Sequence, residues 1–145
     1  MTIEIRNILR EAQHVSLSTL NRDSGFPYSS FSAVATLQDA TPVFLWSDLA
    51  EHTKNIQKDH RIGILCEGRE KPSNPQATPR ISLIGNAIKD NSEAVRQCYL
   101  AKHPSAKGYE SFGDFNYYRF NLEKVHVVAG FGKAFWLENE EFLCP

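Results

Sequence analysis

The sequence has few cysteines and no long apolar run. Its three cysteines, Cys66, Cys98 and Cys144, are an odd number without C-x-x-C spacing, so neither a disulfide framework nor a zinc site is predicted. No stretch approaches the roughly 20 apolar residues that span a bilayer. The N-terminal "MTIEIRNILREAQ" is too charged for a secretory signal peptide. We therefore expect a cytoplasmic protein with reduced thiols, a buried Cys66 and no membrane partner.

The sequence also lacks a charge excess and the common catalytic motifs. Its formal net charge is −1 and its basic residues are scattered, which argues against nucleic acid as a partner. None of the five histidines forms H-x-x-x-H or H-E-x-x-H, so no metal site is expected. G-x-S-x-G, G-x-G-x-x-G and P-loop patterns are missing too. The length of 145 residues predicts one domain spanning 1–145.

What is present is a series of short strands separated by turn-forming residues. Alternating apolar positions, as in "HVSLSTLN", predict half-buried strands, and Gly85 suggests a bulge or a close backbone approach. The expected strands are 14–21, 28–37, 43–47, 61–68, 80–90, 116–130 and 131–137. The expected helices are 3–12, one from Ser47 or Asp48 to Lys58, and 91–104. This pattern predicts a mainly β fold, an antiparallel β-barrel with short helices.

A polar cluster follows the uncharged strand "VFLWS". His52, Thr53, Lys54 and Asn55 offer imidazole, hydroxyl, ammonium and amide groups near an expected helix N-terminus, where backbone N–H groups favour anions. Each of them alone fits an exposed, solvated helix better. Their clustering directly after an aromatic strand favours a phosphate-binding site.

Two further polar sets could contribute to the same ligand. Ser29, Ser30 and Ser32 are unusual in a strand, because serine neither packs well nor favours extended structure. A solvent-facing edge explains these serines equally well. Arg80 and Ser82 open another strand, and an arginine can pair bidentately with phosphate, although a lone arginine at a strand edge is more often a surface residue.

Several of these segments together resemble a known superfamily. The specific motifs are "SDLAEHTKN", "RISLIGNA" and "FGDFNYYR", within a match from His14 to Leu137. They resemble the pyridoxamine 5′-phosphate oxidase-like, FMN-binding split-barrel superfamily, and within it the haem-utilisation branch most closely. The resemblance implies a split barrel of six to seven strands that forms a homodimer, with FMN at the subunit interface.

The resemblance also implies which residues bind the cofactor. The matching positions are Tyr28, Ser29 and Ser30 on the second strand, Trp46 and Ser47 beside the flavin ring, His52, Thr53, Lys54 and Asn55 at the phosphate, and Arg80 with Ser82 at the ring edge. The chain would then be an FMN-dependent oxidoreductase acting on an unidentified small-molecule substrate or electron acceptor. The protein would bind and orient the cofactor, and no residue is assigned as a general acid or base.

Two other functions stay open. In a non-catalytic haem- or flavin-binding protein of haem utilisation, His126 or His52 would be a candidate iron ligand, although a satisfied strand histidine is the favoured interpretation of His126. An empty split barrel that serves as a dimeric interaction module is the third possibility. Oxidation of pyridoxamine phosphate itself is not expected, since the basic C-terminal pattern that binds that substrate is missing.

Overall fold

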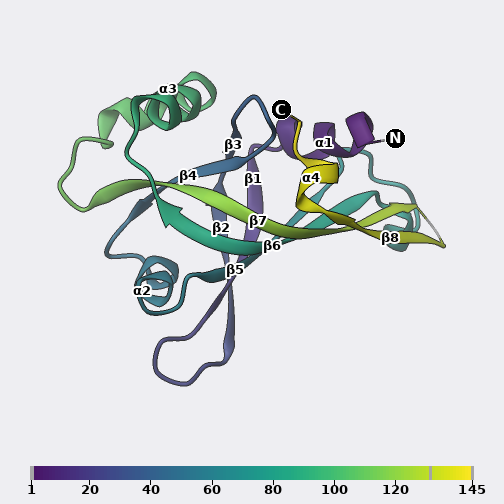
Figure 1. Cartoon of the computed structure of the whole chain (residues 1–145), viewed down its shortest axis with the longest axis horizontal. Helices are drawn as coiled ribbons and strands as arrows, with labels where there is room; N and C mark the ends of the chain where they lie inside the picture. The colour runs from purple at the N-terminus through teal and green to yellow at the C-terminus, as the bar shows by residue number, and fades with distance from the viewer. Residues whose placement is uncertain (1, 131, 145) are drawn as a thin grey trace.

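A bent antiparallel sheet of eight strands carries the fold, and helices pack around it (Figure 1). This computed structural model describes residues 2–130 and 132–144. The strands are β1 (His14–Leu20), β2 (Pro27–Ala33), β3 (Ala35–Thr36), β4 (Pro42–Ser47), β5 (Arg61–Glu67), β6 (Arg80–Lys89), β7 (Phe115–Gly130) and β8 (Lys133–Glu138). The helices are α1 (Thr2–Glu11), α2 (Glu51–Lys58), α3 (Glu93–Lys102), α4 (Asn139–Phe142) and the 3₁₀ turns η1 (Pro75–Ala77) and η2 (Pro104–Gly108).

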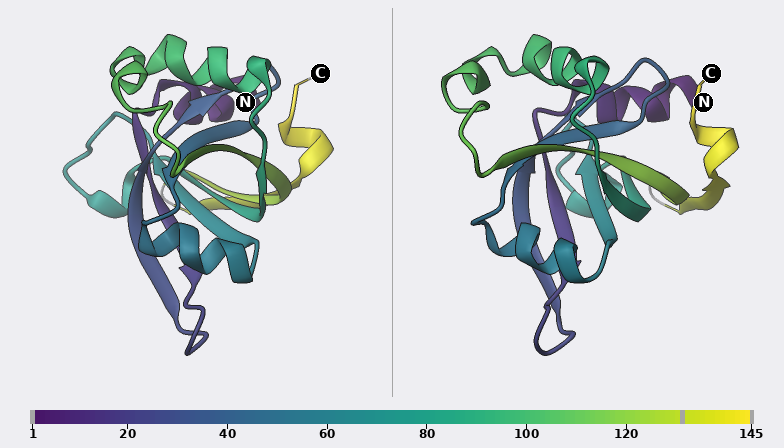
Figure 2. Two further views of the ribbon diagram at one scale, coloured as in Figure 1. Left: turned by 90° about the vertical axis from the view of Figure 1, so that its left-hand side faces the viewer. Right: turned by 60° about the vertical axis from the view of Figure 1, so that its left-hand side comes forward.

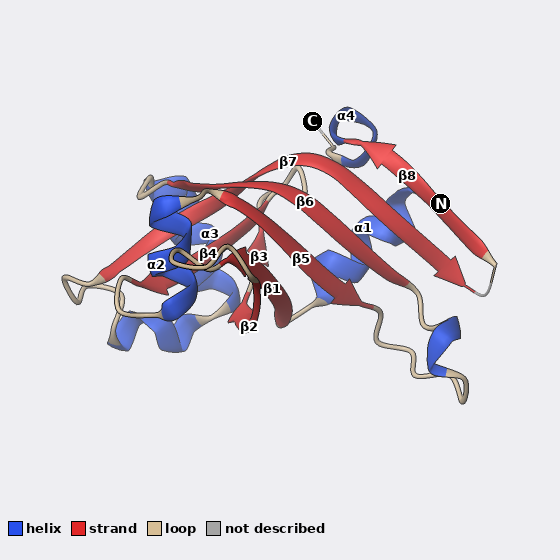
Figure 3. Cartoon of the chain, turned by 90° about the horizontal axis from the view of Figure 1, so that it is seen from below, coloured by secondary structure: helices blue, strands red, loops and turns tan. Residues whose placement is uncertain are grey.

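One segment closes the sheet on itself. The strand order is β2-β1-β5-β6-β7-β4-β3, and β8 adds to β7. Because β2 and β3 are nearly continuous in the chain, residues 27–36 pair with β1 at one end of this order and with β4 at the other. A hydrogen bond of 2.9 Å from Trp46 Nε1 to Ser32 Oγ joins β4 directly to β2. The predicted antiparallel β-barrel with short helices is confirmed, and Figure 3 shows its strong curvature.

The uncharged strand β4 is buried on both faces. Phe44 and Trp46 point into the main core, while Val43 and Leu45 lie in a second apolar cluster that α3 covers. Alternate side chains of a strand project to opposite faces, so a strand covered on both sides needs apolar residues at every position. This explains why "VFLWS" contains no charge.

Gly85 lies at the bulge expected for it. The register between β6 and β7 shifts between Ile84 and Gly85. A Cβ atom at Gly85 would lie only 2.2 Å from the carbonyl oxygen of Asn121, so no larger residue fits without moving the backbone. Both parts of the expectation, a bulge and a close backbone approach, are confirmed.

Several elements differ from the prediction in their bounds, and some were not predicted at all. The predicted strand 28–37 is interrupted at Val34, and α4 was not predicted. Helix α2 starts at Glu51 rather than at Ser47 or Asp48, with Ala50 as an N-cap that makes no side-chain bond. Ser47 instead stabilises a turn, because its hydroxyl donates to Asp114 (2.6 Å) and accepts from the Leu49 amide (3.1 Å).

The three cysteines are free thiols, and Cys66 is the buried one. Cys66 is buried as predicted, and burial raises the pKa of its thiol to about 11, since an apolar surrounding disfavours the thiolate. Within residues 2–130 and 132–144, no helix is both long and apolar enough to cross a membrane.

Candidate functional site

The end of β4 and the start of α2 border a cavity of about 350 Å³. Three of the predicted site residues, Trp46, Ser47 and His52, contribute to its lining. The remaining lining includes Ser32, one of the β2 serines singled out from the sequence, and four aromatic residues that were not predicted: Phe31, Tyr99, Tyr109 and Phe115. An aromatic cavity with a few polar groups is typical of a small-molecule site.

Trp46 belongs mainly to the core rather than to the surface of this cavity. Its side chain is 3% exposed and stacks on Phe44, with 4.6 Å between the ring centroids. The His52 ring meets it edge-on at 5.1 Å, and burial lowers the pKa of His52 because desolvation disfavours the imidazolium. His52 is therefore neutral at pH 7 and offers a hydrogen bond rather than a positive charge.

The four consecutive polar residues on α2 divide into two inward-facing and two outward-facing side chains. Thr53 and Asn55 are buried, whereas His52 and Lys54 are partly exposed. Asn55 donates to Thr19 Oγ1 (3.0 Å) and accepts from the amide and the guanidinium of Arg22 (3.1 Å each). These bonds fasten α2 to β1 and to the long β1–β2 hairpin, which extends beyond α2 in Figure 2.

The first turn of α2 already carries a negative charge. Glu51 lies there and forms an ion pair of 2.7 Å with Arg22, which lowers the pKa of the Glu51 carboxyl. A carboxylate at a helix N-terminus satisfies the same positive end that would attract a phosphate. Lys54, the cation among the predicted phosphate-binding groups, is partly exposed and does not belong to the lining of this cavity.

The serines of β2 alternate between the two faces of the strand. Ser32 is buried and bonded to Trp46, and Ser30 is partly buried with its hydroxyl 3.4 Å from the Leu17 carbonyl. Ser29 and Phe31 project outward, and Tyr28 is also exposed. Ser29 therefore fits the interpretation of a solvent-facing edge, whereas the buried Ser32 does not.

Arg80 and Ser82 lie apart from the β4–α2 cavity. The Arg80 guanidinium donates to the carbonyls of Gln76 and Thr78 (3.1 and 2.9 Å) and so holds the loop before β6. Ser82 faces outward, opposite Leu65 of β5 and His126 of β7. Within one chain the serines of β2 and the polar residues of α2 therefore meet at this cavity through Ser32 and His52, whereas Arg80 and Ser82 do not join them.

A row of cross-strand neighbours on the outer face of the sheet was missed by sequence reasoning. Each member lies directly opposite the next in the strand ladder. We call this set the outer row, and it consists of Phe31, Ser16, Leu65, Ser82, His126 and Trp136. Phe31, Leu65 and Trp136 are large and exposed although alternation places them on the polar side of their strands. Apolar residues at these polar-side positions could have been noticed in the sequence. The sequence does not show, however, that the three residues share one row.

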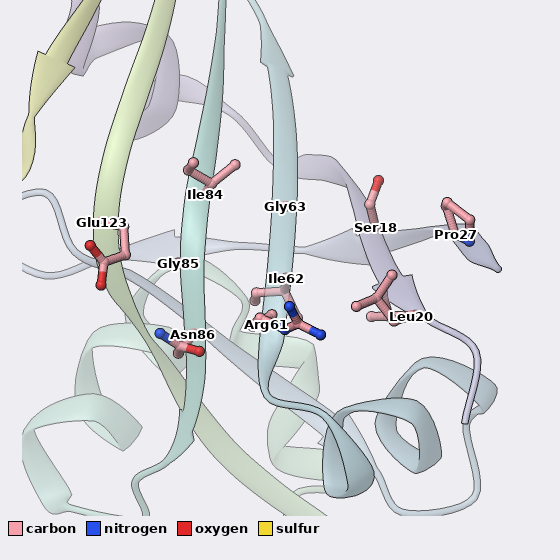
Figure 4. Close-up of a pocket in the computed structure, with 11 residues that line it drawn as sticks. Ser18, Leu20, Pro27, Arg61, Ile62, Gly63, Ile84, Gly85, Asn86 and Glu123 are labelled. Carbon is pink, nitrogen blue, oxygen red and sulfur yellow. The ribbon is translucent and has the colours of Figure 1, made fainter. Parts of the chain in front are cut away.

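A groove of about 510 Å³ runs beside the outer row (Figure 4). Its lining comes from neighbouring strands: Ser18 and Gly63 form a flat floor, and Ile84 stands beside them. Arg61 lies at its edge in an ion pair of 2.7 Å with Asp59, which lowers the pKa of the Asp59 carboxyl to about 2. Small residues between exposed apolar ones leave room for a flat ligand.

The described residues contain no ready site for a bare metal ion. Across residues 2–130 and 132–144, no group of three or more His, Cys, Asp or Glu side chains lies close enough together to hold one.

Comparison with protein families identifies a match along most of the chain. The model described as "CREG, beta-barrel" matches residues 3–144. The chain is 33% identical over 136 residues to the non-canonical heme oxygenase HOZ, chloroplastic, of Arabidopsis thaliana. That alignment covers 91% of this chain but only 41% of the relative, so the chain spans less than half of its length.

Solved structures agree with this assignment. A heme binding protein from Mycobacterium smegmatis superimposes with a TM-score of 0.89 at 29% identity, over 97% of this chain and 59% of that one. A pyridoxinephosphate oxidase family protein from Clostridium acetobutylicum superimposes with a TM-score of 0.72 at 12% identity, over 97% and 96% of the two chains. The second likeness shows the fold alone.

Proposed function

Since the chain belongs to the CREG β-barrel family, we propose that it is a haem-binding protein of haem utilisation, with the tetrapyrrole on the outer face of its sheet. The expected likeness to pyridoxamine 5′-phosphate oxidase-like split barrels and to their haem-utilisation branch is confirmed. The relatives named for haem are similar over nearly the whole of this chain. We therefore favour haem over FMN as the ligand. Haem binding was the alternative left open by the sequence.

The observation that carries the proposal is the exposed apolar surface of the outer row and the adjacent groove. Leu65 and Ile84 are each 43% exposed, and Trp136 is 56% exposed. Large apolar side chains that gather on one face of a protein mark a binding surface more often than singly scattered ones do. The flat floor at Ser18 and Gly63 would accept a planar macrocycle, and Arg61 at the edge would pair with its carboxylates.

The side chains of this face would bind the group, orient it and exclude water from one side of it. Haem, when bound, supplies an iron centre whose axial ligand and surroundings decide between electron transfer and oxygen chemistry. We further propose that the protein is a homodimer, as the resemblance implies, and that the outer face of a second copy covers the other side of the ligand.

Titration with hemin tests this function. We expect a Soret band to appear on addition of hemin to the purified protein and to remain with it through gel filtration. Leu65→Glu should weaken hemin binding by about tenfold or more, because it places a charge on the apolar face. Leu49→Glu is the matched control, since Leu49 is exposed in the turn before α2 and should leave binding unchanged. Wild-type protein that gives no Soret band would contradict the proposal.

A flavin-dependent oxidoreductase is the second candidate, and the β4–α2 cavity favours it. The cavity joins Trp46, Ser47 and His52, three of the positions that the resemblance assigns to FMN. The substrate would be a small molecule that delivers or accepts electrons at the flavin. The remaining positions assigned by the resemblance stay predictions of this candidate.

FMN retention separates this candidate from the first. Lys54→Ala should weaken FMN binding by about tenfold or more through loss of the phosphate charge. Lys58→Ala should not, because the Lys58 ammonium is one helical turn further from the start of α2 and already donates to the Arg22 carbonyl (2.7 Å). Equal FMN retention by the wild type and Lys54→Ala after dialysis would remove the phosphate site from this helix.

A further inference from the structure

His126 lies within the outer row, between Ser82 of β6 and Trp136 of β8. We propose that His126 is the protein ligand of the haem iron, an inference that rests on the haem-binding function proposed above. Haem iron takes a histidine as its proximal ligand in several protein classes, so a single imidazole suffices once the macrocycle is held by other contacts.

The direction of the His126 side chain follows from its strand. Its neighbours Val125 and Val127 are fully buried, so alternation along β7 sends the imidazole to the outer face. Side chains stand roughly perpendicular to a sheet. An imidazole placed in this way would hold a macrocycle over the outer face, next to the neighbouring members of the outer row.

The neighbours of His126 suit such a ligand. Trp136 contacts the imidazole with 4.8 Å between ring centroids and an interplanar angle of 57°, and more than half of its surface stays open for an apolar ligand. On the other side, the small Ser82 leaves space between His126 and the exposed Leu65. Neighbouring strands are about 4.8 Å apart, so one macrocycle bound at His126 would also reach Trp136 and Leu65.

A cation lies at the rim of this surface. The Lys124 ammonium is 5.8 Å from the centroid of the Trp136 ring and 3.8 Å from the Glu138 carboxylate. Both partners are exposed, so this ion pair is weak and can be exchanged for another carboxylate. Lys124 would pair with a propionate of the macrocycle.

The other histidines are less suited to this role. His103 forms a hydrogen bond of 2.7 Å with the Val34 carbonyl, and His52 lies 3.2 Å from the Thr53 hydroxyl and packs against Trp46. His14 reaches the outer face at the start of β1, where Phe31 stacks on it at 4.5 Å. His60 follows α2 in a turn. Among residues 2–130 and 132–144, no hydrogen bond engages the His126 imidazole.

Spectra of the hemin complex test the assignment. We expect the wild type to show the Soret position and the ferric electron paramagnetic resonance signal of an iron with a histidine ligand. His126→Ala should shift both and lower hemin affinity by about tenfold or more, and added imidazole should restore the wild-type spectra. His14→Ala is the matched control, because it removes the other imidazole of the outer face and should leave both spectra unchanged.

Each outcome decides the inference. Identical spectra for the wild type and His126→Ala would overturn the assignment of His126 while the haem-binding function stands. A wild type without a Soret band would overturn both. A folded His126→Ala protein whose spectrum imidazole does not restore also contradicts ligation.

A measurement on the wild type alone covers the case in which the variant does not fold. Diethyl pyrocarbonate modifies accessible imidazoles, and mass spectrometry locates the modified residue. Hemin should protect His126 from this reagent and leave His60 reactive. Equal modification of His126 with and without hemin would contradict the assignment.

Discussion

Asn55 and Lys54 are neighbours on α2 and both polar, but they lie in different surroundings. Asn55 is buried and satisfies groups on β1 and on the turn after it, while Lys54 is partly exposed. A buried amide with several internal partners contributes to stability, because its loss leaves those partners without a hydrogen bond. The resemblance assigned both residues to one phosphate, and the burial of Asn55 makes a structural role the simpler explanation for that residue.

The stability of two variants tests this division. Asn55→Ala should lower the free energy of unfolding by about 1–3 kcal/mol without any ligand, since Thr19 and Arg22 lose their partner inside the protein. Lys54→Ala should change it by less than about 0.5 kcal/mol. Urea unfolding followed by circular dichroism measures both. Equal stability of the two variants would mean that Asn55 has no structural role.

At the scale of elements, the C-terminal helix α4 belongs to the core. Phe142 is 0% exposed and packs within the main apolar cluster. The Arg6 guanidinium donates to the Phe142 carbonyl, which ties α4 to α1, and the two helices lie side by side in Figure 1. The sequence "ENEEFLCP" gave no sign of this, because one apolar turn among acidic residues has no readable period.

Truncation of Phe142 should therefore be costly. We expect Phe142→Ala to reduce the free energy of unfolding by about 3–5 kcal/mol, the range for a large side chain removed from a packed core. Phe112→Ala is the control: Phe112 is 57% exposed, and its loss should cost less than about 0.5 kcal/mol. Similar midpoints for the two variants in thermal unfolding would argue against α4 as part of the core.

A carboxylate fastens the segment between α3 and β7. Glu110 accepts two hydrogen bonds from the Arg96 guanidinium (2.9 and 2.8 Å) and one from the Tyr117 hydroxyl (2.8 Å). The hydrogen bonds from the Arg96 guanidinium, more than its charge alone, lower the pKa of the Glu110 carboxyl below its ordinary value of 4.5. Folded protein thus binds this proton less readily than unfolded protein does, so the contribution to stability is present above about pH 4.5 and is lost as the pH falls through the folded pKa.

The pH dependence of unfolding should reveal this linkage. We expect Glu110→Gln to melt at a lower temperature than the wild type at pH 7, because the charged contacts are lost. The difference should shrink below pH 4.5, where wild-type Glu110 becomes protonated as well. Melting temperatures of both proteins between pH 3 and pH 7 measure it. A difference that stays constant over this range would show that Glu110 does not act through its charge.

At the scale of the whole molecule, the outer row is the surface that a second copy would cover. Its exposed apolar members cross the sheet from β2 to β8. Phe31→Glu should therefore increase the monomer fraction in sedimentation velocity at micromolar concentration. Phe26→Glu should not, since Phe26 lies in the β1–β2 turn away from the row. A wild-type protein that sediments as a monomer would remove the homodimer from the proposal.

Most of the strands and the family likeness could be predicted from the sequence. Alternation in "HVSLSTLN" is local, and Val15 and Leu17 are buried as it indicates. The bulge at Gly85 was readable for the same reason, since a glycine inside a strand pattern has few other causes. The start of α2 was not, because Ser47 has the side chain of a helix cap but bonds Asp114, a residue far along the chain.

The candidate site was predictable only in pieces. The sequence by itself determined which side chains alternate along each strand, since that depends on neighbouring residues alone. Only the tertiary structure decided that Leu65, His126 and Trp136 share one row, because the register between strands depends on contacts between residues distant in the chain. The same long-range packing turned Asn55 inward and left Lys54 outside, which no local pattern could show.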